Sequence, residues 1–102
     1  MDEYPTDDEL ETVSKWPIAT RKDVAELLDY IKSIWKYADC GYFSAKGNTY
    51  KLSTGGWSGN EDIVGAMRMN LIFWALCWYS SKRGGHYVFR MAKIAPRKKE
   101  TP

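Results

Sequence analysis

One stretch of the sequence combines glycines, hydroxyl side chains and an aromatic ring between a strand-like segment and a helical one. It consists of Ser53, Thr54, Gly55, Gly56, Trp57, Ser58, Gly59 and Asn60. The start of a helix carries unpaired backbone N–H groups and a partial positive charge, and glycines let an anion approach the backbone closely. We therefore predict that this stretch, called the glycine loop below, binds a phosphate-bearing ligand, with Trp57 or Tyr42 stacking on a base.

The glycine loop also has a purely structural interpretation. Its glycines can simply form a tight turn, and Trp57 can fold back onto the core. Glu61 lies three residues after Ser58, so the two are expected to form a capping box whose carboxylate would repel an anion. The loop lacks the Lys of a Walker A motif, and its glycine spacing is not G-x-G-x-x-G. Both interpretations stay open from the sequence.

A second candidate group is basic. The segment Lys82-Arg83-Gly84-Gly85-His86 is followed by Arg90 in a stretch with strand-like alternation. If this strand lies beside an earlier hairpin, His86 and Arg90 share one face, and Arg offers a planar fork for phosphate oxygens. We predict Arg83, His86 and Arg90 as charge partners of the ligand. The alternative is a solvated basic edge that discourages aggregation.

Signals for catalysis or metal binding are weak. The sequence Gly56-Trp57-Ser58-Gly59 is one residue short of the G-x-S-x-G elbow that presents a nucleophilic serine. His86 is the only histidine, and no spacing pairs it with Ser58 or with a cysteine. The sequence has no H-x-x-H or C-x-x-C pair. We expect a non-enzymatic protein without cofactor or metal.

The net charge of +2 conceals a separation of charge along the chain. Six acids lie within residues 1–11, before the first base, whereas residues 63–99 contain eight bases and no acid. A basic body favours anionic partners, such as a nucleotide or a nucleic acid. We further hypothesise that the acidic leader occupies the basic surface until a partner displaces it.

Hydrophobic periodicity and turn residues predict the first helix and the first hairpin, which precede the glycine loop. Thr20 and Asp23 predict a capping box, followed by an apolar helical stripe made of Val24, Leu27, Leu28, Ile31 and Trp35. Residues 42–45 and 49–52 predict a hairpin around Lys46-Gly47-Asn48.

A second helix is expected from Gly59 to about Ser80, and a last strand from His86 to Ala92. Asn70 falls on the apolar side of this helix, so its amide either ties down a backbone carbonyl or points into a ligand pocket.

These elements predict a small single α+β domain in the order α-β-β-α-β, with two helices packed on a three-stranded sheet. Residues 1–15 are expected to be a flexible acidic leader, residues 16–92 the domain and residues 93–102 a flexible basic tail.

Two cysteines, Cys40 and Cys77, are too few for a disulfide framework, and we expect reduced thiols in a cytoplasmic protein. The apolar run 71–79 is shorter than the ~20 residues of a membrane span. The many aromatic side chains leave surface for a homodimer.

The sequence S-T-G-G-W-S-G-N-E, with Arg83-Gly84-Gly85-His86-Tyr87 further on, resembles a pattern in small uncharacterised proteins of tailed phages and prophages. The resemblance covers the second half of the chain and implies a phage-encoded counter-defence protein in the bacterial host cytoplasm. Together with the residues above, it predicts a non-enzymatic binder of a nucleotide-derived signal. The alternative is an inhibitor or accessory protein that binds a host defence protein or nucleic acid through its basic surface.

Overall fold

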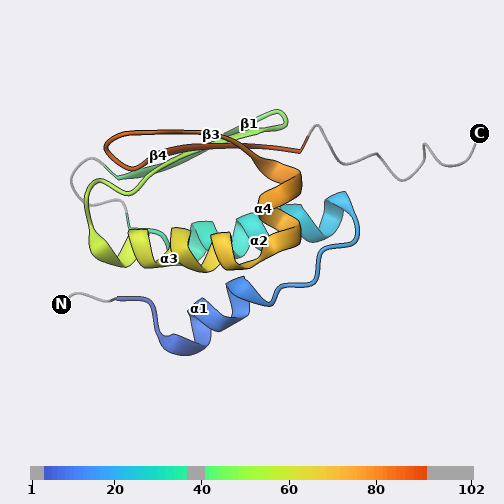
Figure 1. The fold of residues 1–102 in the computed structure, drawn as a ribbon, viewed down its shortest axis with the longest axis horizontal. Coiled ribbons are helices and arrows are strands. Elements are labelled where there is room, and N and C mark those ends of the chain that lie inside the picture. The colour runs from blue at the N-terminus through green and yellow to red at the C-terminus, as the bar shows by residue number, and fades with distance from the viewer. Residues whose placement is uncertain (1–3, 37–40, 92–102) are drawn as a thin grey trace, which may run out of the picture.

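Four helices and one four-stranded antiparallel sheet make up residues 4–36 and 41–91, the parts of the chain that the computed structural model describes (Figure 1). The helices are α1 (Asp7–Ser14), α2 (Arg21–Ile34), α3 (Ser58–Met69) and α4 (Leu71–Cys77). The strands are β1 (Tyr42–Lys46), β2 (Thr49–Ser53), β3 (Trp78–Lys82) and β4 (His86–Arg90). The predicted α+β class is confirmed, but the sheet has one strand more than expected and the helices are twice as many.

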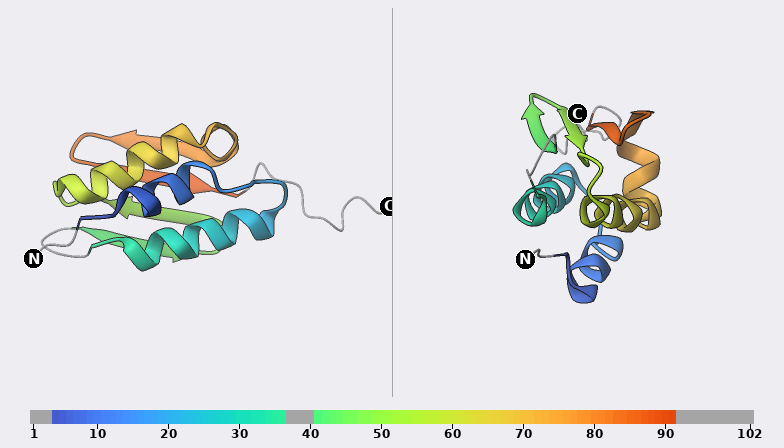
Figure 2. Two further views of the ribbon diagram at one scale, coloured as in Figure 1. Left: turned by 90° about the horizontal axis from the view of Figure 1, so that it is seen from below. Right: turned by 90° about the vertical axis from the view of Figure 1, so that its left-hand side faces the viewer.

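The described elements stack in three layers (Figure 2). The sheet, in the order β1-β2-β4-β3, forms the first layer. Helices α2 and α3 lie side by side beneath it, and α1 lies on the far side of these helices, against α3. All four described helices therefore lie on one side of the sheet, and the other face of the sheet is open to solvent.

Helix α2 begins where the sequence predicts it. The Asp23 carboxylate accepts hydrogen bonds from the backbone N–H groups of Ala19 at 2.7 Å and Thr20 at 3.0 Å, and the Thr20 hydroxyl accepts from Asp23 N at 3.3 Å. The predicted capping box is thus confirmed. The predicted apolar stripe is buried against the sheet and consists of Val24, Leu27, Leu28, Ile31 and Trp35.

The predicted hairpin is also confirmed. Strands β1 and β2 pair antiparallel, and Gly47 adopts a φ of 61° in the turn between them, a conformation that glycine tolerates best. Strand β4 pairs with β2, as the prediction of a shared face for His86 and Arg90 required. On the helix side of the sheet the Phe89 ring meets the Phe73 ring of α4, with centroids 5.5 Å apart.

The expected long helix from Gly59 to Ser80 is wrong because the chain breaks at Asn70. Helix α3 ends at Met69, α4 runs only to Cys77, and Trp78 begins β3. The continuous apolar run over residues 71–79 has no periodicity that separates a helix from a buried strand. The result is a second hairpin, β3 and β4, where the sequence analysis expected one strand.

The Asn70 side chain explains the break. Its Oδ1 accepts from Phe73 N at 3.2 Å and caps α4, while its Nδ2 donates to the carbonyls of Val13 at 3.1 Å and Trp16 at 3.0 Å. The amide therefore joins the end of α1 to the start of α4. Of the two interpretations of Asn70, the one in which it ties down backbone carbonyls is confirmed.

The expectation of a flexible leader over residues 1–15 is wrong for the part that forms α1. Thr6 and Glu9 form a complete capping box, with 2.9 Å from Thr6 N to Glu9 Oε1 and 3.0 Å from Glu9 N to Thr6 Oγ1. Val13 is fully buried. Helix α1 packs on α3, on the opposite side from the sheet (Figure 2). This acidic helix therefore does not occupy the open sheet face, contrary to our hypothesis.

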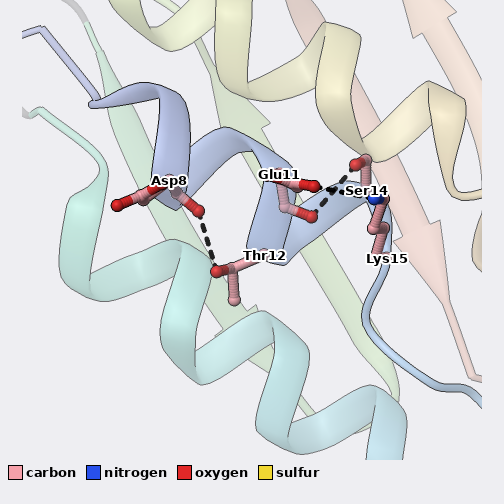
Figure 3. A network of polar contacts seen from close by, with 5 residues as sticks. All are labelled: Asp8, Glu11, Thr12, Ser14 and Lys15. Carbon is pink, nitrogen blue, oxygen red and sulfur yellow. Dashed lines mark hydrogen bonds and ion pairs between the residues drawn. The ribbon is translucent and has the colours of Figure 1, made fainter.

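Hydrogen bonds and one ion pair connect side chains to neighbouring groups in the last turns of α1 (Figure 3). The Thr12 hydroxyl donates to Asp8 O at 2.8 Å, and the Ser14 hydroxyl donates to Glu11 O at 3.0 Å. Lys15 pairs with the Glu11 carboxylate at 2.7 Å, and this contact lowers the pKa of Glu11 and raises that of Lys15. The pair is exposed and adds little stability, so Val13 and the Asn70 amide anchor the helix.

Three sequence expectations lie outside the described residues: the flexible tail over residues 93–102, the end of the last strand at Ala92 and the state of Cys40. Cys77 is described and lies buried at the end of α4.

We predict that Asn70→Ala lowers the free energy of unfolding by about 3 kcal/mol, because it removes a helix cap and leaves two backbone carbonyls without their partner. Urea unfolding followed by circular dichroism measures this change. Asp62→Ala, an exposed substitution on α3, serves as the control and should change stability by less than about 0.5 kcal/mol. Equal midpoints for the two variants would show that the amide does not hold the helices together.

The Asp23 cap predicts a dependence of stability on pH. Hydrogen bonds from the backbone N–H groups of Ala19 and Thr20 lower the pKa of Asp23 in the folded protein. The cap therefore stabilises the fold fully above the ordinary carboxyl pKa of about 3.9, and this contribution is lost as the pH falls through the lower folded value.

Asp23→Asn should accordingly be less stable than the natural protein at pH 7, with the difference in melting temperature shrinking as the pH falls below about 4. Thermal unfolding at several pH values measures this, with Asp29→Asn, an exposed change later in α2, as the control. A difference for Asp23→Asn that stays constant down to pH 2.5 would contradict the cap's role.

Candidate functional site

The backbone donors of the glycine loop are largely used within the fold. Gly55 and Gly56 have φ values of 64° and 79°, which turn the chain between β2 and α3. Four successive N–H groups of the loop donate as follows: Thr54 to Gly85 O (3.0 Å), Gly55 to Ser53 Oγ (3.4 Å), Gly56 to Thr54 Oγ1 (3.2 Å) and Trp57 to Thr54 O (3.1 Å). An anion bound to these four groups would have to displace bonds that hold the turn.

Asn60 connects the loop to the end of α2. Its side chain is buried, and Nδ2 donates to Lys36 O at 2.9 Å and Thr54 O at 3.3 Å, while Oδ1 accepts from Lys36 N at 3.0 Å. All of these partners are backbone groups. Asn60 therefore has a structural role that accounts for its hydrogen-bonding groups.

The predicted capping box between Ser58 and Glu61 is wrong. Helix α3 begins at Ser58 itself, and Trp57 occupies the cap position without a side-chain hydrogen bond to the helix. The Glu61 carboxylate accepts from the Thr54 hydroxyl at 3.4 Å, and the Ser58 hydroxyl donates to Tyr4 OH at 3.1 Å. Thr54 is fully buried in the turn. The hydroxyl that Glu61 contacts is therefore that of Thr54 and not that of Ser58.

The Trp57 ring covers the first turn of α3. A Cβ added to Gly59 would overlap this ring, so Gly59 is the residue that lets Trp57 fold down onto the helix. The other neighbour of the ring is Tyr4, with ring centroids 4.9 Å apart. These contacts favour the structural interpretation of the loop, in which Trp57 folds back and packs on the first turn of α3.

Of the basic site residues, His86 lies beside the first residue of the glycine loop, whereas Arg90 lies at the far end of its strand. Arg83 is exposed in the turn between β3 and β4. His86 pairs with Ser53, at the loop end of β2, whereas Arg90 pairs with Thr49, at the opposite end. Four residues of strand separate His86 from Arg90, about 14 Å. The structure therefore does not bring Arg90 to the glycine loop.

His86 and Arg90 instead share the open face of the sheet, and each contacts an exposed ring. The His86 ring stacks on Tyr42 with a centroid distance of 6.4 Å and an interplanar angle of 28°. The Arg90 guanidinium lies 4.0 Å above the centre of the Tyr79 ring. Tyr42 and Tyr79 are 42% and 54% exposed. The face thus presents two pairs of a basic side chain and an aromatic ring.

The strand register places further basic side chains on the same face of the sheet. Lys82 pairs with His86, Lys51 pairs with Val88 at the centre, and Lys46 pairs with Thr49 next to Arg90. None of the residues in the four described strands is Asp or Glu. We call these residues together the basic sheet face: Tyr42, Lys46, Lys51, Tyr79, Lys82, His86 and Arg90.

A shallow hollow of about 310 Å³ lies at one end of the basic sheet face. Lys46, Lys51 and Arg90 line it together with the hydroxyl-bearing side chains of Ser44 and Thr49. Three cations and two hydroxyl donors around one hollow are suited to the oxygens of a phosphate or carboxylate group.

Lys46, Lys51 and Tyr79 were not among the ligand-binding residues predicted from the sequence, and Lys82 was named there only as part of the basic segment. The alternation within residues 42–46 and 49–53 could have placed Lys46 and Lys51 on the face of Tyr42. Tyr79 could not be found in this way, because its segment was interpreted as a helix.

The described parts of the chain contain neither a cluster of metal ligands nor a membrane-spanning helix. Within residues 4–36 and 41–91, no three His, Cys, Asp or Glu side chains are grouped so that they could hold a metal ion. Among the helices α1 to α4, none is long and apolar enough to cross a membrane. The expectation of a protein without cofactor or metal stays a prediction.

We predict that Gly59→Ala lowers the free energy of unfolding by roughly 1–3 kcal/mol, because the new methyl group must displace the Trp57 ring. Gly65→Ala in the same helix is the matched control, since nothing lies within 4 Å of its added Cβ. This control should be neutral or more stable by up to about 1 kcal/mol, because alanine favours a helix. Urea unfolding compares the two, and equal stabilities would refute the packing of Trp57 on Gly59.

Comparisons with known proteins leave the fold and the basic sheet face as the only guides to function. No protein-family model, no curated protein and no solved structure matched the chain. The resemblance to phage proteins therefore stays a prediction.

Proposed function

We propose that this protein is a non-enzymatic binder of phosphate-bearing ligands and that the basic sheet face is its binding surface. The observation that carries the proposal is the one-sided composition of this face. Every ionisable group in its described strands, apart from tyrosine, is basic, and two exposed tyrosines lie among them. Such a surface attracts anions and offers rings on which bases can stack.

The charges of this face are available to a ligand. Two ion pairs of the described residues, Glu11 with Lys15 and Lys22 with Glu26, lie at α1 and on α2. These pairs lie on the helical side of the sheet. A phosphate at the hollow would therefore meet Lys46, Lys51 and Arg90 without first displacing one of these carboxylates.

The glycine loop supports this surface in our proposal. Its Thr54 N–H donates to Gly85 O, which joins the β2–α3 turn to the β3–β4 turn. The loop thereby fixes the ends of β2 and β4, whose exposed residues form the centre of the basic sheet face. The alternative site, an anion at the start of α3, is retained as an outcome of the test below.

The phage resemblance adds a biological context to the proposal. A phosphate-bearing ligand in a bacterial host would be a nucleotide-derived signal or a nucleic acid, and sequestering either would serve a counter-defence protein. A host defence protein with an acidic surface is the competing partner.

We predict that Arg90→Ala weakens binding of the probe ADP about tenfold, because one charge-assisted contact is worth about 1.4 kcal/mol or more. Lys51→Ala should act in the same direction. Isothermal titration calorimetry at low salt measures the dissociation constant, with Lys22→Ala on α2 as the charge-matched control. Affinity for ADP should also fall as salt is added.

Ser58→Ala decides between the two sites. It should leave ADP binding unchanged if the sheet face is the site, since Ser58 lies at the start of α3. Loss of affinity in Ser58→Ala but not in Arg90→Ala would reject the sheet face in favour of the glycine loop. If the natural protein binds neither ADP, nor inorganic pyrophosphate, nor an oligonucleotide, the proposed function is rejected altogether.

A further inference from the structure

The two exposed rings of the basic sheet face lie at opposite corners of the sheet. Tyr42 is on β1, one edge strand, in the row of His86; Tyr79 is on β3, the other edge strand, next to Arg90. Three strand spacings separate the edges, about 14 Å, and two to three residues along the strand separate the His86 row from the bulge at Tyr79, about 8 Å. The diagonal is therefore about 16 Å, too long for one nucleotide to bridge.

Basic side chains occur along the whole diagonal. Lys82 and His86 lie at the Tyr42 end of the face, Lys51 lies at the centre, and Lys46 and Arg90 lie at the Tyr79 end. A ligand with a single phosphate group would contact only some of these basic side chains. A chain of phosphates would use all of it, since each phosphate adds a charge at a regular spacing.

The contacts of each ring suit a flat aromatic base. His86 stacks on Tyr42, and the Arg90 guanidinium lies over Tyr79. Aromatic rings and guanidinium planes both serve as stacking surfaces for unpaired bases. In a double helix the faces of the bases are covered by neighbouring bases. The tyrosine rings and the guanidinium plane of the protein would therefore find no free base on which to stack in a duplex.

From these observations we infer that the basic sheet face binds single-stranded nucleic acid, with one base stacked at the Tyr42–His86 corner and another at the Tyr79–Arg90 corner. This inference rests on the proposed function and names its ligand class. A strand rises about 3.4 Å per stacked nucleotide. The diagonal therefore corresponds to about five such steps, which join about six nucleotides.

The test measures binding of fluorescently labelled oligothymidylates of two, four, six, eight and twelve nucleotides by fluorescence anisotropy at fixed salt. Affinity should rise steeply up to about six nucleotides, where both corners are occupied, and level off beyond that length. A 12-base-pair duplex with the same label should bind at least tenfold more weakly than the twelve-nucleotide single strand.

Substitutions at the two rings test the stacking directly. Tyr42→Ala and Tyr79→Ala should each weaken binding of the eight-nucleotide strand about tenfold, whereas Tyr42→Phe and Tyr79→Phe should retain affinity because the ring remains. Tyr4→Ala is the matched control, because Tyr4 is as exposed as Tyr79, at 54%, and contacts Trp57, away from the basic sheet face. Thermal unfolding of every variant confirms that each is folded at the temperature of the measurement.

The outcomes separate this inference from the proposed function. If ADP binds and depends on Arg90, but oligonucleotide affinity ignores both length and the tyrosines, the single-strand inference is overturned and the proposed function stands. Equal affinity for duplex and single strand also overturns it. If neither ADP nor any oligonucleotide binds, both fail.

Discussion

The side chain of Asn70 satisfies three backbone groups from two distant parts of the chain, the carbonyls of Val13 and Trp16 and the N–H of Phe73. A buried amide that competes for backbone partners interrupts a helix that the surrounding apolar residues would otherwise continue. Because α3 stops there, α4 leaves the helix layer and carries the chain up to the sheet (Figure 1). Strand β3, and with it the Tyr79 corner, depends on this break.

The basic sheet face also depends on the position of the hydrophobic core, which lies on only one side of the sheet. The large buried side chains of the sheet, among them Leu52 and Phe89, point toward α2, α3 and α4. Strand alternation then leaves every other side chain on the opposite face without a helix over it. The glycine loop belongs to the same scaffold, because the bonds of Thr54 and Asn60 hold β2, α2 and the β3–β4 turn in place.

Short-range signals made part of this fold predictable. Thr20 and Asp23 marked the start of α2, Gly47 marked the hairpin, and alternation placed His86 and Arg90 on one face, all of which depends on neighbours along the chain. Helix α1 was missed because half of its residues are acidic, and its burial rests on Val13 and on an amide 57 residues away. The bond from Thr54 N to Gly85 O could not be inferred either, since it joins residues that lie 31 positions apart in the sequence.

The layered order of the molecule gives it an electrical polarity. The first turn of α1 carries Asp7, Asp8 and Glu9 on the outermost layer, and the bases of the sheet lie on the opposite side of the helices. In the field of a polyanion such a molecule experiences a torque as well as an attraction, because its acidic pole is repelled while its basic pole is drawn in. Encounters that begin in the wrong orientation are therefore turned toward the sheet before contact. The small net charge of +2 does not reveal this behaviour.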